Sequence, residues 1–235
     1  MRVDSQLGYR APRGQGIDCS YRNEIFLYMG SREYYLLAYN VIQFTGWAAA
    51  LSLLLRGSPE REVYDLVYVF QSLSMLEILN VLVGIVQADL VTTFIQVFSR
   101  LQVLLVHHLV DEARSDGGNY YMLIAWCLVE VIRYPFLGLK IVSTPPYILT
   151  WLRYSVFYIL YPIGVYGEMM VIHSALPSIT FNKTLSITLP NAWNIEFDFA
   201  SYLKLLVYIL YLPGLAIQYS HMIKQRKNAL VIKGQ

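Results

Sequence analysis

The segment from Trp151 to Leu176, WLRYSVFYILYPIGVYGEMMVIHSAL, is the part of the sequence that most constrains the fold. It is apolar enough to cross a bilayer, yet Glu168 lies near its middle. An ionisable group at that depth costs at least roughly 2.5 kcal/mol if it faces lipid, so it is expected to face protein, water or a ligand. The segment therefore predicts a membrane helix with a polar site on an inward face.

A second polar group, Tyr161, stands seven residues before Glu168. Seven residues of α-helix turn through about 700°, so the phenol and the carboxylate share a face, with their Cα atoms ~10.5 Å apart along the axis. Between them, Pro162 removes a backbone donor and is expected to bend the helix. Gly164 and Gly167 expose the backbone to a close neighbour. The pattern predicts an acid and a phenol presented together on a closely packed helix.

The composition of the whole chain also indicates a membrane protein. Of its 235 residues, 56% are hydrophobic and 14% are charged, whereas soluble domains carry roughly 25% charged residues. One soluble core cannot bury such an excess of apolar side chains. The net charge of +2 is too small to indicate a nucleic-acid partner. The first thirty residues lack the apolar core of a cleavable signal peptide, so the first membrane helix is expected to act as an uncleaved anchor.

Six apolar segments of near-spanning length follow one another along the chain, separated by polar or Pro-containing links. We therefore predict an all-α polytopic membrane protein, a bundle of six transmembrane helices. The predicted spans are 34–55, 63–86, 90–110, 120–142, 151–176 and 199–222. The expected divisions are a flexible N-terminal arm (1–33), a membrane domain (34–223) and a basic tail (224–235).

The distribution of lysine and arginine predicts the orientation of this bundle. Six spans place both termini on one side of the membrane. That side carries eleven lysines and arginines, in the arm, the fourth link and the tail, and the opposite side carries four. Because cytosolic loops are enriched in these residues, both termini are expected in the cytosol.

Other charged residues also fall inside the predicted spans: Glu77, Arg100, Glu130 and Arg133. They can pair with one another and hold the bundle together, as intramembrane charges commonly do, or they can line a cavity together with Glu168. Glu130 and Arg133 are three residues apart and can pair on one helical face. There is no HxxxH, CxxC or HxxE pattern and no Gly-rich phosphate loop, so neither a metal nor a cofactor is expected.

Several motifs agree in order and spacing with one known family. They are LEILNVLVGIV (76–86), TTFIQVFSR (92–100), VEVIRYPF (129–136), WLRY (151–154) and YPIGVYGE (161–168). Over roughly residues 34–227 the chain resembles the very-long-chain (3R)-3-hydroxyacyl-CoA dehydratases, also called protein-tyrosine-phosphatase-like proteins. The resemblance implies a six-helix enzyme of the endoplasmic-reticulum membrane with cytosolic termini. Its reaction would convert (3R)-3-hydroxyacyl-CoA to trans-2-enoyl-CoA, the third step of very-long-chain fatty-acid elongation.

The resemblance also implies site residues. The Tyr and Glu of the family's YPxGxxxE motif are its catalytic pair, and they correspond to Tyr161 and Glu168. A carboxylate buried in apolar surroundings is a stronger base, so we expect Glu168 to remove the α-proton and Tyr161 to protonate the departing hydroxide; the reverse assignment stays open. Arg133 is the first candidate for a positive neighbour. The substrate-binding residues expected around the pair are Arg133, Arg153, Arg100 and Glu130.

The expected partners are the 3-hydroxyacyl-CoA substrate, membrane lipid and other fatty-acid elongation enzymes. Basic residues on the expected cytosolic face can meet the phosphates of CoA, although the orientation rule alone predicts them: Lys140, Arg153 and the cluster 224–227. The segment ILNVLVGIV lacks the His and Cys from which the phosphatase-like name derives, so phosphatase chemistry has no nucleophile here. The ending VIKGQ is not a clear double-lysine retrieval signal. Two other classes stay open, a non-catalytic scaffold for elongation enzymes and a small transporter.

Overall fold

The computed structural model describes residues 29–231, and most of this range is helical. The described residues contain no β-strand, only an isolated bridge between Ile187 and Phe197. The prediction of an all-α fold is therefore confirmed. The elements are α2 (Ser31–Leu55), α3 (Glu60–Leu73), α4 (Met75–Leu82), α5 (Leu90–Leu109), α6 (Asp111–Arg114), α7 (Gly118–Val142), α8 (Tyr147–Ser155), α9 (Phe157–Asn182), α10 (Phe199–Leu205), the π-helical segment η1 (Leu206–Leu210) and α11 (Tyr211–Val231).

Five single spans and one bent pair are long and apolar enough to cross a membrane. The single spans are α2, α3 with α4, α5, α7 and α9. The sixth is formed by Phe199–Leu210 and Pro213–Leu230, which meet at an angle of 47°. Large apolar side chains such as Val41, Ile159 and Ile209 are exposed on the outside, as a lipid-facing surface requires. The chain is a polytopic helical membrane protein.

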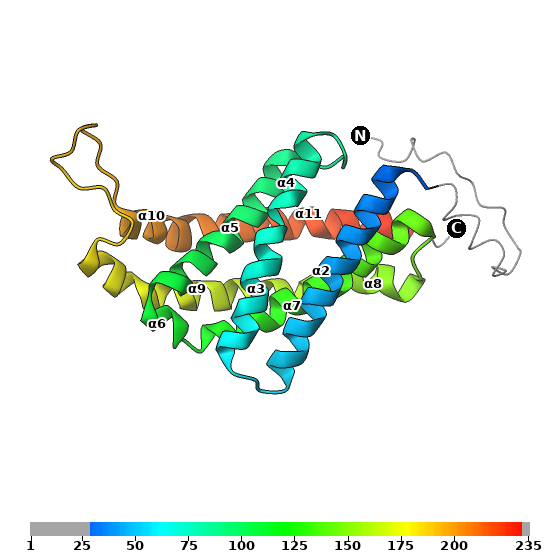
Figure 1. The fold of residues 1–235 in the computed structure, drawn as a ribbon, viewed down its shortest axis with the longest axis horizontal. Coiled ribbons are helices and arrows are strands. Elements are labelled where there is room, and N and C mark those ends of the chain that lie inside the picture. Colours follow the sequence, from blue (N-terminus) through cyan, green and yellow to red (C-terminus); the bar gives the residue numbers. More distant parts are fainter. Residues whose placement is uncertain (1–28, 232–235) are drawn as a thin grey trace, which may run out of the picture.

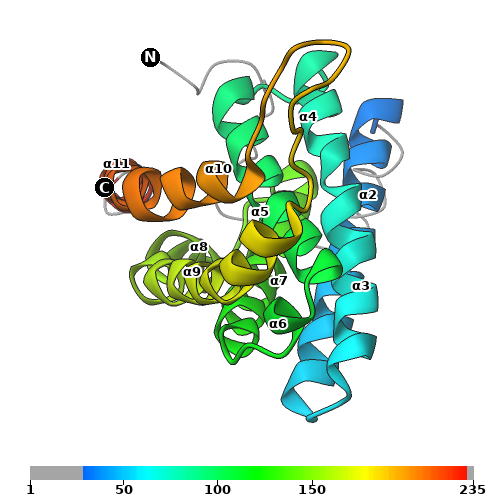
Figure 2. The ribbon, with the colours of Figure 1, turned by 90° about the vertical axis from the view of Figure 1, so that its left-hand side faces the viewer.

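The helices form a bundle whose connections alternate between two ends (Figure 1). The start of α2, the α4–α5 and α7–α8 links and the end of α11 lie toward one end. The α2–α3 turn, the α5–α7 connection and the loop between α9 and α10 lie toward the other. Seen end-on, α10 and α11 occupy one side of the bundle and α2 and α3 the opposite side, with α5 and α7 between them (Figure 2).

The fifth helix does not have the predicted bounds. A turn at Val156 separates α8 from α9, so the helix begins at Phe157 instead of Trp151. Near this start, Pro162 cannot donate a hydrogen bond to the carbonyl of Tyr158, four residues earlier. That carbonyl instead accepts a hydrogen bond of 3.3 Å from the Tyr219 hydroxyl of α11.

At its other end α9 passes through Pro177 and stops at Asn182, six residues beyond the predicted end at Leu176. Proline within a helix is better tolerated in a membrane protein, where neighbouring groups satisfy the freed backbone. The second predicted span is broken at Ser74 into α3 and α4 and ends at Leu82 instead of Val86.

The two terminal segments are described only in part. The predicted tail from 224 is helical as far as Val231, because α11 continues beyond the predicted end of the sixth span at 222. Within the predicted arm, α2 already begins at Ser31. Residues 1–28 and 232–235 lie outside the described residues.

The central contact of the bundle is between α7 and α9, where Gly167 permits a very close approach. A Cβ atom at Gly167 would lie 2.5 Å from the backbone nitrogen of Met122 and 2.6 Å from the carbonyl oxygen of Gly118. Both of those atoms belong to the backbone of α7 and cannot move aside as a flexible side chain would. Gly164, one turn earlier, is less restricted, with 3.3 Å from its ideal Cβ position to the Cβ of Ala125. The predicted close neighbour of these two glycines is thus α7.

We expect Gly167→Ala to push α7 and α9 apart and to lower the thermal unfolding midpoint of the purified protein in detergent, at a cost of roughly 1–3 kcal/mol. Gly117→Ala is the matched control, because Gly117 has helix-compatible angles (φ −62°, ψ −17°) and nothing within 4 Å of its Cβ position. Equal midpoints for the two variants would show that the close contact does not limit stability.

Candidate active site

One large, partly enclosed cavity lies inside the bundle, with a volume of about 980 Å³. That is the upper end of the range of roughly 300–1,000 Å³ found for small-molecule sites. Its walls come from α2, α3, α4, α5, α7, α8, α9 and the η1–α11 segment. Tyr161 and Glu168 both line it from α9, so the phenol and the carboxylate face one space.

The carboxylate of Glu168 is buried, with 9% of the residue exposed, and both of its oxygens are hydrogen-bonded. Trp126 Nε1 on α7 donates to Oε1 at 2.8 Å. The Tyr211 hydroxyl, at the start of α11, donates to Oε2 at 2.9 Å. Because a buried charge requires partners, these two donors explain how the carboxylate is held inside an apolar bundle. Three helices meet at this one side chain.

Tyr161 has a different environment. It lines the cavity from α9, three residues before Gly164. Its hydroxyl makes no hydrogen bond to any other described residue. Its proton therefore remains available to a molecule inside the cavity. Glu168 is fixed by its neighbours, whereas the Tyr161 hydroxyl is open to a ligand.

Arg100 on α5 contacts Trp126, the residue that donates to Glu168. Its Nη1 donates to Glu130 Oε1 at 2.5 Å, and its guanidinium lies 5.0 Å from the ring centroid of Trp126. Arg100 lines the same cavity as Tyr161 and Glu168. Arg100 therefore sits behind the indole that holds the carboxylate.

Arg133, the expected positive neighbour of the pair, is committed to other partners. Its two terminal nitrogens donate to both oxygens of Glu77, at 2.9 and 2.8 Å. Its Nε donates to Glu130 Oε2 at 2.6 Å. Tyr134 and Tyr39 also donate their hydroxyls to Glu77 Oε1, at 2.9 and 3.1 Å.

These charges join three helices, and a tyrosine adds a fourth. Glu130 binds Arg100 through one oxygen and Arg133 through the other, and Arg133 continues the chain to Glu77. The interpretation that the intramembrane charges pair with one another thus describes these four residues, and all four also line the cavity. They connect α4, α5 and α7, with Tyr39 adding α2, next to the Tyr161–Glu168 wall.

Polar side chains line the cavity toward the end of the bundle where α2 begins and α11 ends. Arg153 of α8 lines it, and so do Gln218, His221 and Gln225 of α11. Asp89 lies there too, capping α5 by accepting from the backbone nitrogen of Thr92 at 2.7 Å. The hydrogen bonds from Thr92 lower the pKa of the Asp89 carboxyl, which stays ionised.

Trp126 and Tyr211 were not predicted from the sequence. Each is one aromatic residue among many in a chain with 20 tyrosines and 4 tryptophans. Tyr211 lies two residues before Pro213, and Trp126 lies four residues, about one turn, before Glu130. Neither signal is specific, because only the packing of α7 and α11 on α9 brings both donors to Glu168.

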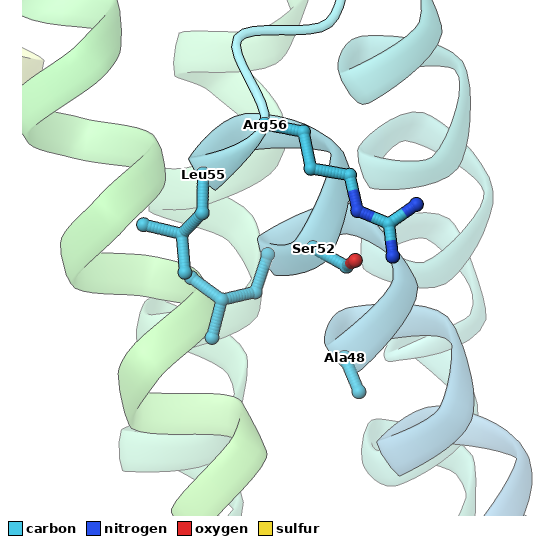
Figure 3. A pocket seen from close by; sticks show the side chains of 5 residues that line it. Ala48, Ser52, Leu55 and Arg56 are labelled. Carbon is cyan, nitrogen blue, oxygen red and sulfur yellow. The ribbon is translucent and has the colours of Figure 1, made fainter.

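A second pocket lies on the outside of α2, near its end. It is lined by Ala48, Leu51, Ser52, Leu55 and Arg56 (Figure 3). No carboxylate or phenol faces it, so it offers no acid–base pair.

Comparisons with known proteins show the family to which the chain belongs. The family model described as "Protein tyrosine phosphatase-like protein, PTPLA" matches residues 71–231, which contain Tyr161, Glu168 and both donors to the carboxylate. The chain belongs to this family.

Similar proteins come from animals and plants. The chain is 38% identical over 205 residues to mouse "Very-long-chain (3R)-3-hydroxyacyl-CoA dehydratase 2", covering 83% of this chain and 80% of the mouse protein. It is 36% identical to "Very-long-chain (3R)-3-hydroxyacyl-CoA dehydratase hpo-8" of Caenorhabditis elegans, covering 83% of this chain and 94% of the relative. It is 38% identical to "Very-long-chain (3R)-3-hydroxyacyl-CoA dehydratase PASTICCINO 2" of Arabidopsis thaliana, covering 85% and 94%. No solved structure matches the chain.

We expect Arg133→Met to destabilise the protein by about 3 kcal/mol, because it leaves Glu77 and Glu130 without their shared cation. Arg114→Ala is the control: its pair with Asp111 is exposed on both sides, and such pairs contribute about 1 kcal/mol or less. Thermal unfolding in detergent measures both. An Arg133→Met protein as stable as the control would show that the charge chain contributes little to holding the helices together.

Proposed function

We propose that this protein dehydrates (3R)-3-hydroxyacyl-CoA to trans-2-enoyl-CoA, the third step of the very-long-chain fatty-acid elongation cycle. Family membership and the names of the relatives support the reaction class. The observation that carries the proposal for this chain is the pair Tyr161 and Glu168 on the wall of one cavity in the membrane domain.

Glu168 is the general base in this proposal. The α-proton next to a thioester carbonyl is a very weak acid, so its removal needs a base that is close, aligned and shielded from water. Glu168 is buried, and Trp126 and Tyr211 hold its carboxylate in one orientation. Once it takes the proton from C2, the electron pair left behind forms the new bond between C2 and C3.

Tyr161 is the general acid. As the double bond forms, the bond between C3 and its oxygen breaks, and hydroxide leaves poorly unless it is protonated. The Tyr161 hydroxyl, which has no other described hydrogen-bond partner, gives its proton to that oxygen, which departs as water. The proton on Glu168 then returns to the Tyr161 oxygen, directly or through water. In this proposal the positive charge of Arg100, which lines the same cavity, stabilises the negative charge that passes between the two.

The cavity also suits the two ends of the substrate. Its apolar wall includes Ile95, Leu160 and Leu210, and each CH₂ group removed from water there contributes about 0.8 kcal/mol. The anionic CoA is placed at the polar end, where Arg153 lines the cavity. In this arrangement Arg153 binds the substrate. Arg100, Glu130 and Arg133 are ion-paired with one another and stabilise the wall beside the Tyr161–Glu168 pair.

We further propose that the protein resides in the endoplasmic-reticulum membrane with both termini in the cytosol, together with other elongation enzymes. The excess of lysine and arginine on the side of the termini supports the orientation. The start of α2 and the end of α11 lie toward the same end of the bundle, which is compatible with both termini being on one side of the membrane (Figure 1).

Glu168→Gln and Tyr161→Phe should each abolish formation of the enoyl product by purified, folded protein. Each placed acid or base typically contributes a factor of about 10²–10⁴. The assay follows trans-2-enoyl-CoA from (3R)-3-hydroxypalmitoyl-CoA. Tyr166→Phe is the matched control, because Tyr166 lies on the same helix with 55% of its surface exposed and does not line the cavity.

Near-normal turnover by both single variants would place the chemistry elsewhere. Absence of turnover in the wild-type protein, with solute flux in liposomes, would favour a transporter. A Glu168→Gln protein that still replaces a missing dehydratase in cells would favour a non-catalytic scaffold.

The orientation has its own test. A glycosylation acceptor inserted between residues 188 and 194 should be modified in cells, because this loop is expected to face the lumen. The same acceptor added after Gln235 should stay unmodified. The opposite pattern would reverse the proposed topology.

A further inference from the structure

Glu168 is hydrogen-bonded by a phenol, but that phenol belongs to Tyr211, not to Tyr161. The Tyr211 hydroxyl donates to Oε2 at 2.9 Å, while Trp126 Nε1 donates to Oε1 at 2.8 Å. A carboxylate oxygen has two lone pairs, so each oxygen keeps one that is not used by these donors. The carboxylate is thus held at two points, from two helices, with capacity left to accept a proton.

We propose that Tyr211 is a positioning residue for this dehydration: with Trp126 it fixes the plane of the Glu168 carboxylate so that a free lone pair faces the cavity beside Tyr161. This inference rests on the proposed function and goes one step further, because it assigns a task to a residue of the sixth span. Charge-assisted hydrogen bonds are short and strong enough for such a task.

The local structure around Tyr211 is unusual in the way that functional positions often are. Tyr211 directly follows the π-helical segment Leu206–Leu210, and π-helical turns occur frequently at functional sites. Pro213 explains the distortion, because it cannot donate to the carbonyl of Ile209 and its ring crowds that carbonyl. The 47° bend between the two parts of the span lies at the same place. The irregular backbone and the hydroxyl on the carboxylate therefore occur together.

One face of α11 lines the cavity along much of its length. Tyr211, Leu215, Gln218, Met222 and Gln225 recur at intervals of three and four residues and all line the cavity. One face of α11 is therefore a wall of the substrate space, and Tyr211 lies where that wall reaches the carboxylate. A base that is misplaced by about 1 Å can lose roughly 10²-fold in rate, so a fixed wall contact can control the rate.

The test compares Tyr211→Phe with the wild-type protein on (3R)-3-hydroxypalmitoyl-CoA in detergent. Phenylalanine keeps the ring and removes only the hydroxyl. We expect kcat to fall about 10-fold to 100-fold with KM within about 3-fold, because substrate contacts remain while the base loses its alignment. Tyr208→Phe is the matched control: Tyr208 lies on η1 and its hydroxyl contacts His173 Nδ1 at 2.5 Å, away from Glu168. It should keep both constants.

Trp126→Phe is a second variant, which removes the donor to the other oxygen and should give the same loss in kcat. Its control is Trp47→Phe, because Trp47 is equally buried and its Nε1 has no hydrogen-bond partner among the described residues. This pair separates loss of the hydrogen bond from loss of indole packing, and it remains informative if Tyr211→Phe does not fold.

Three results would overturn the inference while leaving the proposed function intact: unchanged kcat in both donor variants, a rise in KM at constant kcat, or an equal loss of kcat in the controls. Failure of the proposed function is recognised separately, because wild-type and Glu168→Gln proteins would then form the enoyl product at the same rate. A positioning role that acts only through Glu168 also predicts that Tyr211→Phe causes no further loss of the residual rate of a Glu168→Gln protein.

Discussion

The architecture depends on holding one carboxylate, that of Glu168, inside a bundle of apolar membrane helices. An unpaired charge there is very costly, and Glu168 is retained because an indole from α7 and a phenol from the sixth span each donate to one of its oxygens. The close α7–α9 contact at Gly167 brings the first donor near, and the bend after η1 brings the second. The same contacts therefore pack the helices and position the base. A shift of α7 or α11 would change how the Glu168 carboxylate is held.

A second polar layer supports the first. The ion-paired chain Arg100–Glu130–Arg133–Glu77 joins α5, α7 and α4, and its Arg100 end stacks on the indole that holds Glu168. Buried ion pairs add little stability compared with well-packed apolar residues, but they are costly to break, which favours one arrangement of the helices. The result is a fixed set of charges that lines the same cavity as the Tyr161 hydroxyl, which has no hydrogen-bond partner among the described residues.

The sequence predicted what depends on local pattern and missed what depends on packing. Apolar length was sufficient for the spans, and the seven-residue spacing was sufficient to place Tyr161 and Glu168 on one cavity. The predicted bounds of the fifth helix, Trp151 and Leu176, were wrong. Pro177 was treated as a helix end, which proline often is not in membranes. The turn at Val156 has no nearby glycine or proline that would signal it. Trp126 and Tyr211 could not be singled out, because their role depends on contacts 42 and 43 residues away in the chain.

The central claim is that a 3-hydroxyacyl chain lies in the cavity with C2 at Glu168 and its hydroxyl at Tyr161. A structure of the Glu168→Gln protein bound to (3R)-3-hydroxypalmitoyl-CoA measures this directly. We expect C2 about 3–3.5 Å from the side chain at position 168 and the substrate hydroxyl within hydrogen-bond distance of Tyr161. An acyl chain bound outside the cavity, or with C2 and C3 remote from both side chains, would contradict it.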